Sequence, residues 1–250
     1  MPEEGLSGQV WVITGGAGAI ADSIGRAFAA AGARLVLADL ERAHEALAVR
    51  ARELGAMPLT ADLTRVEEAE ALVRRVRDDM GRVDGLIHTV GAYAGGRVHE
   101  VEPSQYDRLF DLNVRTLFYC VRAVLPVMLE QGEGFLAGFA SGPAWRGMGP
   151  GAALYAAAKS AVATFLRSLD EELRNRRRPG SETPAGPTGG IRVAVVYPMG
   201  VVDTPANRRA MPDADRRGWI DPREIAAALL FAATRGTGAR LMELPVYPGR

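Results

Sequence analysis

The stretch TGGAGAIA, residues 14–21, joins a short apolar run to a segment with helical periodicity. Gly16, Gly18 and Ala21 satisfy the pattern G-x-G-x-x-G/A. In this pattern glycines permit positive φ and let backbone N–H groups approach a pyrophosphate at the positive end of a helix. We therefore expect a dinucleotide-binding turn between a first strand and a first helix.

A second strand, expected at residues 34–38, ends in Asp39. In dinucleotide-binding folds an acidic residue about 20 positions beyond the glycines accepts a hydrogen bond from the ribose 2′-hydroxyl. A carboxylate there would also repel a 2′-phosphate, so the sequence favours NAD (NADH in its reduced form) over NADP. The alternative is a tight strand-helix turn in which Asp39 caps the next helix.

Beyond residue 39 apolar and amphipathic segments continue to alternate. Short apolar runs, typical of strands buried on both faces, are residues 10–14, 35–38, 86–90, 135–140 and 193–197, and residues 238–246 could supply a last strand. Helical periodicity is found at residues 20–31, 41–54, 66–80, 106–129 and 153–173. We therefore predict an α/β fold with one doubly wound, Rossmann-type parallel sheet and helices on both faces.

Composition limits the class of protein. The 250 residues fit a single domain, residues 1–250, because single α/β domains of roughly this size are routine. Thirty basic and 30 acidic residues cancel, which argues against nucleic acid or a membrane as a partner and favours a small-molecule substrate. The single cysteine, Cys120, fits a reducing compartment. The N-terminus is acidic where a secretory signal is basic, and no apolar run approaches the roughly 20 residues of a membrane span, so we expect a cytoplasmic protein.

Residues 175–190 depart from the alternating pattern. Three arginines, residues 176–178, lead into a stretch rich in Pro, Gly, Ser and Thr. This composition predicts an exposed loop insertion. The arginines could bind an anionic group, but a solvated turn is the simpler interpretation.

Tyr155 and Lys159 lie four residues apart in a helical segment, so their side chains share one face. Lys159 is the only lysine among the 30 basic residues. An ammonium beside a phenol stabilises the phenolate and lowers its pKa, which makes the tyrosine a usable general acid or base. Lysine suits this position because it is a compact charge that can also reach a cofactor ribose. The pair predicts proton transfer at a substrate oxygen while a nicotinamide exchanges hydride with the carbon.

These features, together with Asp62, the turn at Gly91, Asn113 and the segment 198–204, occur in an order that resembles the short-chain dehydrogenases/reductases over nearly the whole chain. The resemblance implies an NAD(P)-dependent oxidoreductase with a seven-stranded parallel sheet. It also implies that Asp62 lies near the adenine, and that the protein is a homodimer or homotetramer packed through the long helices around Asn113 and Tyr155.

The same resemblance implies a cofactor site that extends from the glycine-rich turn to the segment 198–204. The residues expected to contact the cofactor are Thr14, Gly15, Gly16, Gly18, Ala19, Ile20, Asp39, Leu40, Asp62, Leu63, Val90, Gly91, Tyr155, Lys159, Pro198, Met199, Val201 and Thr204. We expect no metal site.

The chain departs from the family pattern at two places that concern the cofactor. The family's turn usually reads T-G-x-x-x-G-x-G, and Ala19 and Ala21 stand at its last two glycines. A methyl group on Ala19 beside the pyrophosphate could lower affinity or force an altered turn. The family's N-N-A-G after the fourth strand is here HTVG, residues 88–91, and we interpret His88 as a structural hydrogen-bonding residue rather than a catalyst.

Asn113 and Ser141 complete the expected catalytic set. The resemblance gives Asn113 the task of holding a water that links to Lys159 in a proton relay; the alternative is a plain internal hydrogen bond. The family's serine, which hydrogen-bonds the substrate oxygen, usually stands thirteen residues before the tyrosine, where this chain has Gly142. Ser141 serves in its place if the loop 142–151 carries one extra residue.

Two segments, residues 83–96 and 203–219, are similar to the corresponding segments of dihydropteridine reductases. Those enzymes reduce a quinonoid pterin with NADH and do not need the serine. We expect residues 203–219 to close over the substrate as a lid. Candidate pocket walls are Tyr93, His99, Trp145 and Met148.

Three functions therefore remain open. The leading one is an NAD(H)-dependent oxidoreductase acting on a small carbonyl or alcohol substrate. The second is reduction of a quinonoid imine, as in dihydropteridine reductases, and the third is a dinucleotide-binding regulator without catalysis. The fold does not define the substrate.

Overall fold

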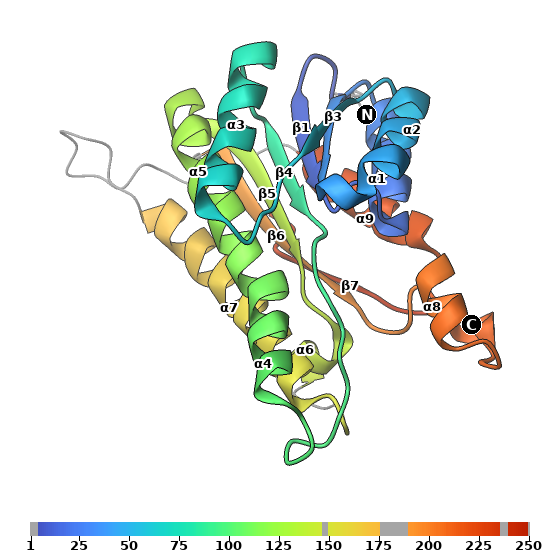
Figure 1. Cartoon of the computed structure of the whole chain (residues 1–250). Helices are drawn as coiled ribbons and strands as arrows, with labels where there is room; N and C mark the ends of the chain where they lie inside the picture. The colour runs from blue at the N-terminus through green and yellow to red at the C-terminus, as the bar shows by residue number, and fades with distance from the viewer. Residues whose placement is uncertain (1–4, 147–149, 176–189, 236–239, 250) are drawn as a thin grey trace.

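A computed structural model of the chain describes residues 5–146, 150–175, 190–235 and 240–249. Within these residues seven parallel strands form one sheet in the order β3-β2-β1-β4-β5-β6-β7 (Figure 1). The strands are β1 Val10–Thr14, β2 Arg34–Asp39, β3 Met57–Thr60, β4 Gly85–His88, β5 Glu133–Phe139, β6 Gly190–Pro198 and β7 Glu243–Val246. The predicted doubly wound sheet is confirmed, as is the strand number implied by the family resemblance.

Helices cover both faces of the sheet, as predicted (Figure 1). One face carries α1 Ala19–Ala30, α2 His44–Leu54 and α9 Pro222–Ala233, and the other carries α3 Val66–Met80, α5 Thr116–Gln131 and α7 Ala153–Asn175. Three shorter helices, α4 Pro103–Phe110, α6 Gly142–Arg146 and α8 Pro205–Ala210, lie beyond the carboxyl ends of the strands.

Consecutive side chains of one strand enter different cores, which explains the unbroken apolar runs. In β1, Val10 and Val12 pack under α3, α5 and α7, whereas Trp11 and Ile13 pack under α1, α2 and α9. All four are essentially inaccessible to solvent. A strand buried on both faces has no exposed position to break the apolar pattern.

Strand β3 and helix α9 were absent from the prediction, as were the short helices α6 and α8. Strand β3 lies at the edge of the sheet and alternates half-buried with exposed positions, so it leaves no continuous apolar run. Helix α9 is capped by Asp221, whose side chain accepts a hydrogen bond from the Arg223 N–H at 2.9 Å, and Pro222 stands at the first helical position. The predicted strand at 86–90 was too long by two residues, since β4 ends at His88.

Helices α4 and α5 join into one helix through a π-helical turn, Asp111–Arg115. By length and composition this helix, Pro103–Gln131, could span a membrane, which differs from our expectation that no segment approaches that limit. Within the fold it packs against α3, α7 and β5, and 44% of its most apolar part is buried. We interpret it as a core helix.

The predicted loop insertion at 175–190 falls almost wholly outside the described residues. Its first residue, Asn175, ends α7, and its last, Gly190, begins β6.

Candidate active site

The predicted site residues gather at the carboxyl edge of the sheet. Thr14 at the end of β1 is the register partner of Ala38 in β2 and of His88 in β4. The strand order reverses between β1 and β4, and in open parallel sheets ligands bind in the crevice at such a switch point. The glycine-rich turn after β1 therefore lies where the fold places a ligand.

Close packing explains the glycines at the start of this turn. Gly15 has φ +70°, and a Cβ on it would lie 2.7 Å from the Thr89 hydroxyl oxygen. A Cβ on Gly16 would lie 2.9 Å from the Leu37 Cβ and 3.1 Å from the Ala38 nitrogen. The turn thus presses against β2 and the loop after β4, and larger residues would force it outward.

Helix α1 follows with Gly18 as its N-cap residue. Ala19 is the first helical residue, and among the described residues only glycines have positive φ, so Ala19 lies in ordinary helical backbone. Ala21 is fully buried and contributes its methyl group to the core under α1. The first intrahelical bond runs from the Asp22 N–H to the Gly18 carbonyl at 3.0 Å, which leaves the preceding N–H groups outside the helical bonding pattern.

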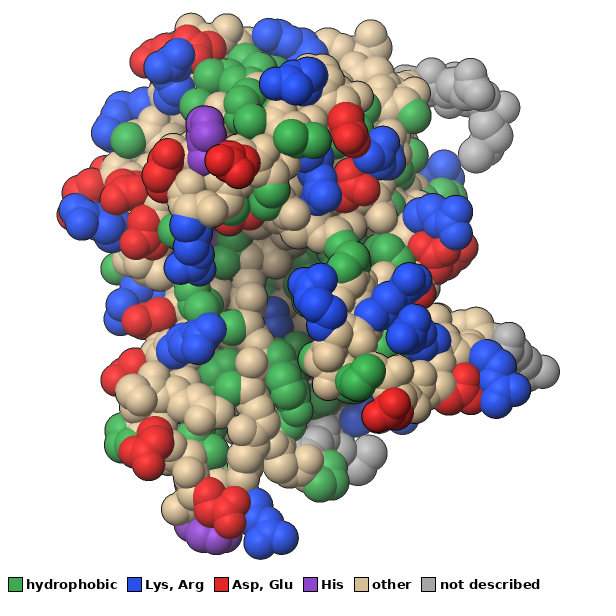
Figure 2. All heavy atoms as spheres, turned by 45° about the vertical axis from the view of Figure 1, so that its right-hand side comes forward, with side chains coloured by type: hydrophobic (Ala, Val, Ile, Leu, Met, Phe, Trp, Pro, Cys, Tyr) green, Lys and Arg blue, Asp and Glu red, His purple; other side chains and the backbone are tan. Residues whose placement is uncertain are grey.

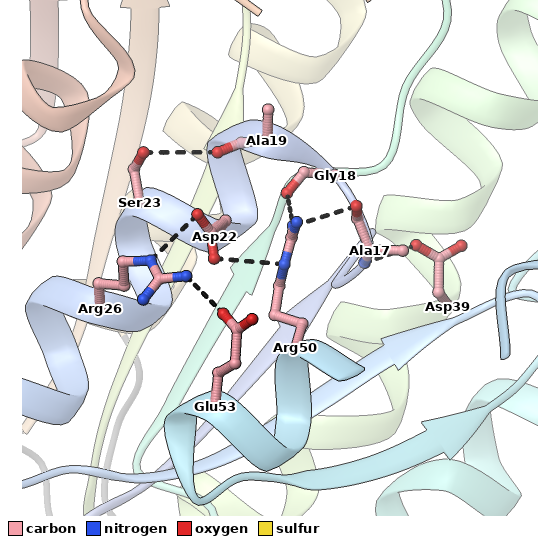
Figure 3. Close-up of polar contacts among 9 residues, drawn as sticks. All are labelled: Ala17, Gly18, Ala19, Asp22, Ser23, Arg26, Asp39, Arg50 and Glu53. Atoms are coloured by element: carbon pink, nitrogen blue, oxygen red, sulfur yellow. Dashed lines mark hydrogen bonds and ion pairs between the residues drawn. The ribbon is translucent and has the colours of Figure 1, made fainter. Parts of the chain in front are cut away.

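Asp39 holds the turn. Its Oδ2 accepts a hydrogen bond from the Ala17 N–H at 3.0 Å (Figure 3). Its Oδ1 accepts one from the Leu40 N–H at 2.8 Å. Each carboxylate oxygen can accept a second hydrogen bond, so these contacts leave capacity for a ribose hydroxyl. The hydrogen bond between Asp39 and the glycine-rich turn was not predicted from the sequence.

Asp62 lies two residues beyond β3, whose last residue, Thr60, pairs with Asp39. The Oδ1 of Asp62 accepts hydrogen bonds from the N–H and the hydroxyl of Thr64, at 3.0 and 2.7 Å. Leu63 is buried. Asp62 therefore shares the sheet edge with Asp39 and has one oxygen fixed by the local turn.

Lys159 is buried in α7, with only 6% of its surface exposed. Its Nζ donates a hydrogen bond to the Phe139 carbonyl at 2.8 Å. Burial lowers the pKa of the Lys159 ammonium to about 8, because desolvation disfavours the charged form. The only lysine of the chain is thus an internal group, unlike a solvated helix lysine.

Tyr155 lies one turn before Lys159 and packs against Tyr93 with ring centroids 5.0 Å apart. We expected Lys159 to lower the pKa of the Tyr155 phenol, but this expectation was wrong. The pKa is raised, chiefly by burial and also by Tyr93, while a side-chain hydrogen bond with Ser141 works in the opposite direction.

Ser141 is buried, and its side chain is close enough to Tyr155 to lower the pKa of the phenol. The Ser141 carbonyl accepts the Trp145 N–H at 3.1 Å, and this bond closes the first turn of α6. Gly142 lies instead against Pro198 and Met199, where a Cβ would be 3.4 Å from the Met199 Cα. Ser141 is therefore a hydroxyl-bearing residue close to the phenol, and its role in place of the expected serine stays a prediction.

Asn113 is buried in the π-helical turn. Its Nδ2 donates to the carbonyls of Ala92 at 2.9 Å and Leu109 at 2.8 Å, and its Oδ1 accepts the Ala92 N–H at 3.3 Å. A Cβ on Gly91 would lie 2.7 Å from the Asn113 Oδ1 and 3.0 Å from the Lys159 Nζ. Glycine at position 91 therefore lets Asn113 and Lys159 converge behind the loop that follows β4.

His88 bridges two hydroxyl groups inside the fold. Its Nδ1 lies 2.8 Å from the Thr14 Oγ1, and its Nε2 lies 3.0 Å from the Thr116 Oγ1. Burial, and secondarily the charge of Lys159, lowers the pKa of His88 to about 3, so the ring is neutral. These contacts fit the structural role expected for His88.

The C-terminal segment begins at the end of β6. Pro198, Met199 and Val201 are partly buried there, and the Thr204 hydroxyl caps α8 by accepting the Asn207 N–H at 3.2 Å. A bridge between Val202 and Ile220 closes the segment 203–219 at its base. On the face shown in Figure 2 the surface is hollowed, with apolar side chains inside the hollow and basic side chains along part of its rim.

The candidate pocket walls differ in their surroundings. Tyr93 is 69% exposed next to Tyr155. Trp145 packs edge-on against Tyr197, with centroids 4.7 Å apart, and the His99 side chain is 74% exposed beside Glu100. Tyr93 therefore contacts the predicted catalytic residue Tyr155 through its ring, and Trp145 contacts Ser141 through its backbone N–H. Met148 lies outside the described residues.

Sequence reasoning missed an arginine that contacts the glycine-rich turn. Arg50 of α2 donates hydrogen bonds to carbonyls of the turn (Figure 3). In a chain with 30 basic residues, one arginine on an amphipathic helix carries no distinctive sequence signal. The contact depends on how α2 folds back beside α1.

Comparison with known proteins agrees with this geometry. The model of the short chain dehydrogenase family matches residues 9–215. An uncharacterized oxidoreductase of Staphylococcus haemolyticus is 30% identical over 246 residues, which cover 97% of this chain and 98% of the relative. One of Staphylococcus aureus is 29% identical over the same length and coverage.

Solved structures extend the likeness to proteins with bound cofactors. A variant of actinorhodin polyketide ketoreductase with NADPH superposes with a TM-score of 0.83 at 26% identity, covering 96% of each chain. The 3-ketoacyl-(acyl-carrier-protein) reductase from Brucella melitensis complexed with NADH gives 0.82 at 26% identity, covering 98% of this chain and 99% of the other.

The chain therefore belongs to the short-chain dehydrogenase family. It is an oxidoreductase of that family, whose structural neighbours bind NADH in one case and NADPH in another.

Proposed function

We propose that this oxidoreductase transfers hydride between NAD(H) and a small carbonyl or alcohol substrate. The observation that carries the proposal is the burial of two side chains, Ser141, which lowers the pKa of the Tyr155 phenol, and Lys159, which binds the Phe139 carbonyl two residues before Ser141. A hydroxyl next to the proton donor suits a substrate whose oxygen gains negative charge during reduction.

The residues of the turn and strand ends fit a dinucleotide. N–H groups at the start of α1 suit a pyrophosphate, Asp39 retains acceptor capacity for a ribose hydroxyl, and Asp62 lies on the same edge for the adenine. The remaining proposed cofactor contacts are Thr14, Gly15, Gly16, Gly18, Ala19, Ile20, Leu40, Leu63, Val90, Gly91, Tyr155, Lys159, Pro198, Met199, Val201 and Thr204. When bound, the nicotinamide supplies or accepts the hydride.

Each side chain has a separate task. Tyr155 gives a proton to the substrate oxygen during reduction and takes it back during oxidation, while Ser141 donates a hydrogen bond to that same oxygen. Lys159 holds α7 against the end of β5, and its ammonium lies next to the Gly91 backbone. Asn113 keeps the π-helical turn and the loop at Ala92 together, and we assign it the water that continues a proton path to Lys159.

We propose NADH as the preferred cofactor because the Asp39 carboxylate faces the edge where a 2′-phosphate would be bound. Desolvating that phosphate beside a carboxylate is unfavourable, whereas a 2′-hydroxyl can donate to it. The proposal concerns this chain alone, since its neighbours include both NADH and NADPH complexes.

The decisive experiment is an absorbance assay with NADH and NADPH over a panel of aldehydes, ketones, alcohols and a quinonoid dihydropterin. The control is Tyr155→Phe, which keeps the ring and removes the proton donor. We expect turnover of carbonyl substrates with NADH, and a kcat at least ~100-fold lower for Tyr155→Phe with cofactor binding retained. Tight NADH binding without turnover of any substrate would instead support a dinucleotide-binding regulator.

Two further assignments are proposals of the same kind. We assign residues 1–250 to one cytoplasmic domain in which residues 203–219 close over the substrate. A homodimer or homotetramer would pack through α5 and α7, where Phe118 is 43% exposed and its ring lies 6.1 Å from that of Phe165. Sedimentation of wild type and Phe118→Asp tests this interface.

A further inference from the structure

Arg50 reaches the glycine-rich turn from α2. Its Nη1 donates hydrogen bonds to the Ala17 carbonyl at 3.1 Å and to the Gly18 carbonyl at 2.5 Å (Figure 3). Two carbonyls one residue apart can both face a single nitrogen only if the backbone between them is held in one conformation. The guanidinium therefore fixes the turn from the side of α2.

The orientation of Arg50 is itself fixed by a charged chain. Its Nε lies 3.2 Å from the Asp22 Oδ1, and the Asp22 Oδ2 accepts a hydrogen bond from the Arg26 Nε at 3.2 Å. Arg26 also pairs with Glu53 of α2 at 2.7 Å. Only 23% of the Arg50 side chain is exposed, whereas Arg26 is 55% exposed. The inner pair, Arg50 with Asp22, is the better protected of the two.

These contacts determine where the backbone N–H groups point. Within a planar trans peptide the C=O of one residue and the N–H of the next point in opposite directions. The Gly18 carbonyl faces Arg50 and the Asp22 N–H, so the N–H of Ala19 faces away from both. On the other flank, Asp39 holds the N–H of Ala17. The turn is thus held between a cation on its carbonyls and a carboxylate on one N–H.

We propose that Arg50 is a positioning residue of the dinucleotide site: by binding the carbonyls of Ala17 and Gly18 it aims the Ala19 N–H at the cofactor pyrophosphate. This inference rests on the proposed dinucleotide binding. Arg50 acts through the backbone and has its charge matched by Asp22, so it serves NADH and NADPH equally. A direct contact with a 2′-phosphate, the other role open to an arginine here, would favour NADPH alone.

The test compares Arg50→Gln and Arg50→Lys with Arg52→Gln, a matched change at an exposed arginine of the same helix. Dissociation constants for NADH, NADPH and ADP-ribose are measured by calorimetry, and KM and kcat by absorbance. For Arg50→Gln we expect a Kd about tenfold higher for all three ligands, with the NADH to NADPH ratio changed by less than about twofold. KM for cofactor should rise in parallel, while kcat at saturation falls less than about threefold.

Arg50→Lys should recover part of the affinity, because one ammonium can bind a single carbonyl but cannot bridge both and Asp22. Arg52→Gln should match the wild type.

Thermal unfolding without cofactor is recorded for each variant, and a lower melting temperature with unchanged Kd would reduce Arg50 to a structural residue and overturn the inference. A selective loss of NADPH affinity would overturn it in favour of a phosphate contact. If the wild type binds neither dinucleotide, the proposed function fails and this inference with it, whereas wild-type binding with unaffected Arg50 variants rejects the inference alone.

Discussion

The Lys159 Nζ donates its hydrogen bond to the carbonyl of Phe139, two residues before Ser141. The only lysine of the chain thus joins helix α7, which carries Tyr155, to the end of β5, which leads into Ser141. Because Lys159 fixes the segments that carry Tyr155 and Ser141 relative to one another, we expect this position to tolerate little change in side-chain shape.

We expect Lys159→Arg to lower kcat at least ~100-fold although the charge is kept. A planar guanidinium is larger than an ammonium and cannot reproduce the compact contact with Phe139 in a buried site. The measurement is steady-state kinetics, with Ser160→Ala on the same helix as the control and circular dichroism to check folding. Full activity of the arginine variant would reject the argument from shape.

The burial of Lys159 also predicts a pH dependence of stability. Its folded pKa of about 8 lies below the unfolded value of 10.5, so between these values the unfolded chain binds more protons than the folded one. Stability therefore rises with pH across this window, and the penalty of burying the ammonium is fully present below pH 8. The rise is at most about 1.4 kcal/mol per pH unit.

Urea unfolding at pH 7, 8 and 9 checks this prediction against Lys159→Met, which removes the titrating group and keeps much of the side-chain volume. Between pH 8 and pH 9 the free energy of unfolding of the wild type should rise by about 1 kcal/mol more than that of the variant. Parallel pH profiles for the two proteins would mean that Lys159 is not desolvated in the folded state.

Asp39→Ala should lower the preference for NADH over NADPH at least ~10-fold, measured as the ratio of kcat/KM values. The change removes the repulsion of a 2′-phosphate and the acceptor for a 2′-hydroxyl. It also leaves the Ala17 N–H without its side-chain partner, so the absolute affinity for NADH should fall as well. A wild type that already prefers NADPH contradicts the assignment of Asp39 at once.

Much of the fold could be predicted because strands buried on both faces leave unbroken apolar runs. The run at residues 10–14 coincides with β1, and the helical period at 66–80 coincides with α3. Strand β3 was missed because an edge strand with alternating exposure has no such run. The π-helical turn at Asn113 could not be predicted from the helical periodicity either, because one extra residue in a helical turn does not interrupt an apolar segment.

The candidate site also contains residues that could be predicted from the sequence and residues that could not. Tyr155 and Lys159 could be recognised because their spacing is local and lysine is otherwise absent. Arg50 could not, because its contact with Gly18 joins residues 32 positions apart. The direction of the Tyr155 pKa shift was wrong because it depends on burial, and periodicity does not report how deeply a helix end is covered.

Ser141→Ala distinguishes carbonyl reduction from reduction of a quinonoid imine. A carbonyl oxygen gains negative charge as hydride arrives, and a hydroxyl that stabilises this charge is worth about 2 to 4 kcal/mol, or roughly 30- to 1000-fold in rate. A delocalised imine needs chiefly hydride and one proton, so loss of the hydroxyl should change its reduction little. We therefore expect Ser141→Ala to lose kcat by this range on the best carbonyl substrate.

The contact between Ser141 and Tyr155 complicates the interpretation, because it also lowers the pKa of the phenol. Removing the hydroxyl should raise that pKa further, and this effect acts on every substrate that takes its proton from Tyr155. Profiles of kcat against pH for wild type and Ser141→Ala separate the two effects: a shifted profile with an unchanged plateau reports the phenol, and a lower plateau reports the lost contact with the substrate oxygen. Gly142→Ala serves as the control, since a Cβ at that position makes only ordinary contacts with Pro198 and Met199. If Ser141→Ala leaves the plateau unchanged on all carbonyls while a quinonoid dihydropterin is reduced rapidly, the carbonyl mechanism has to be given up for imine reduction.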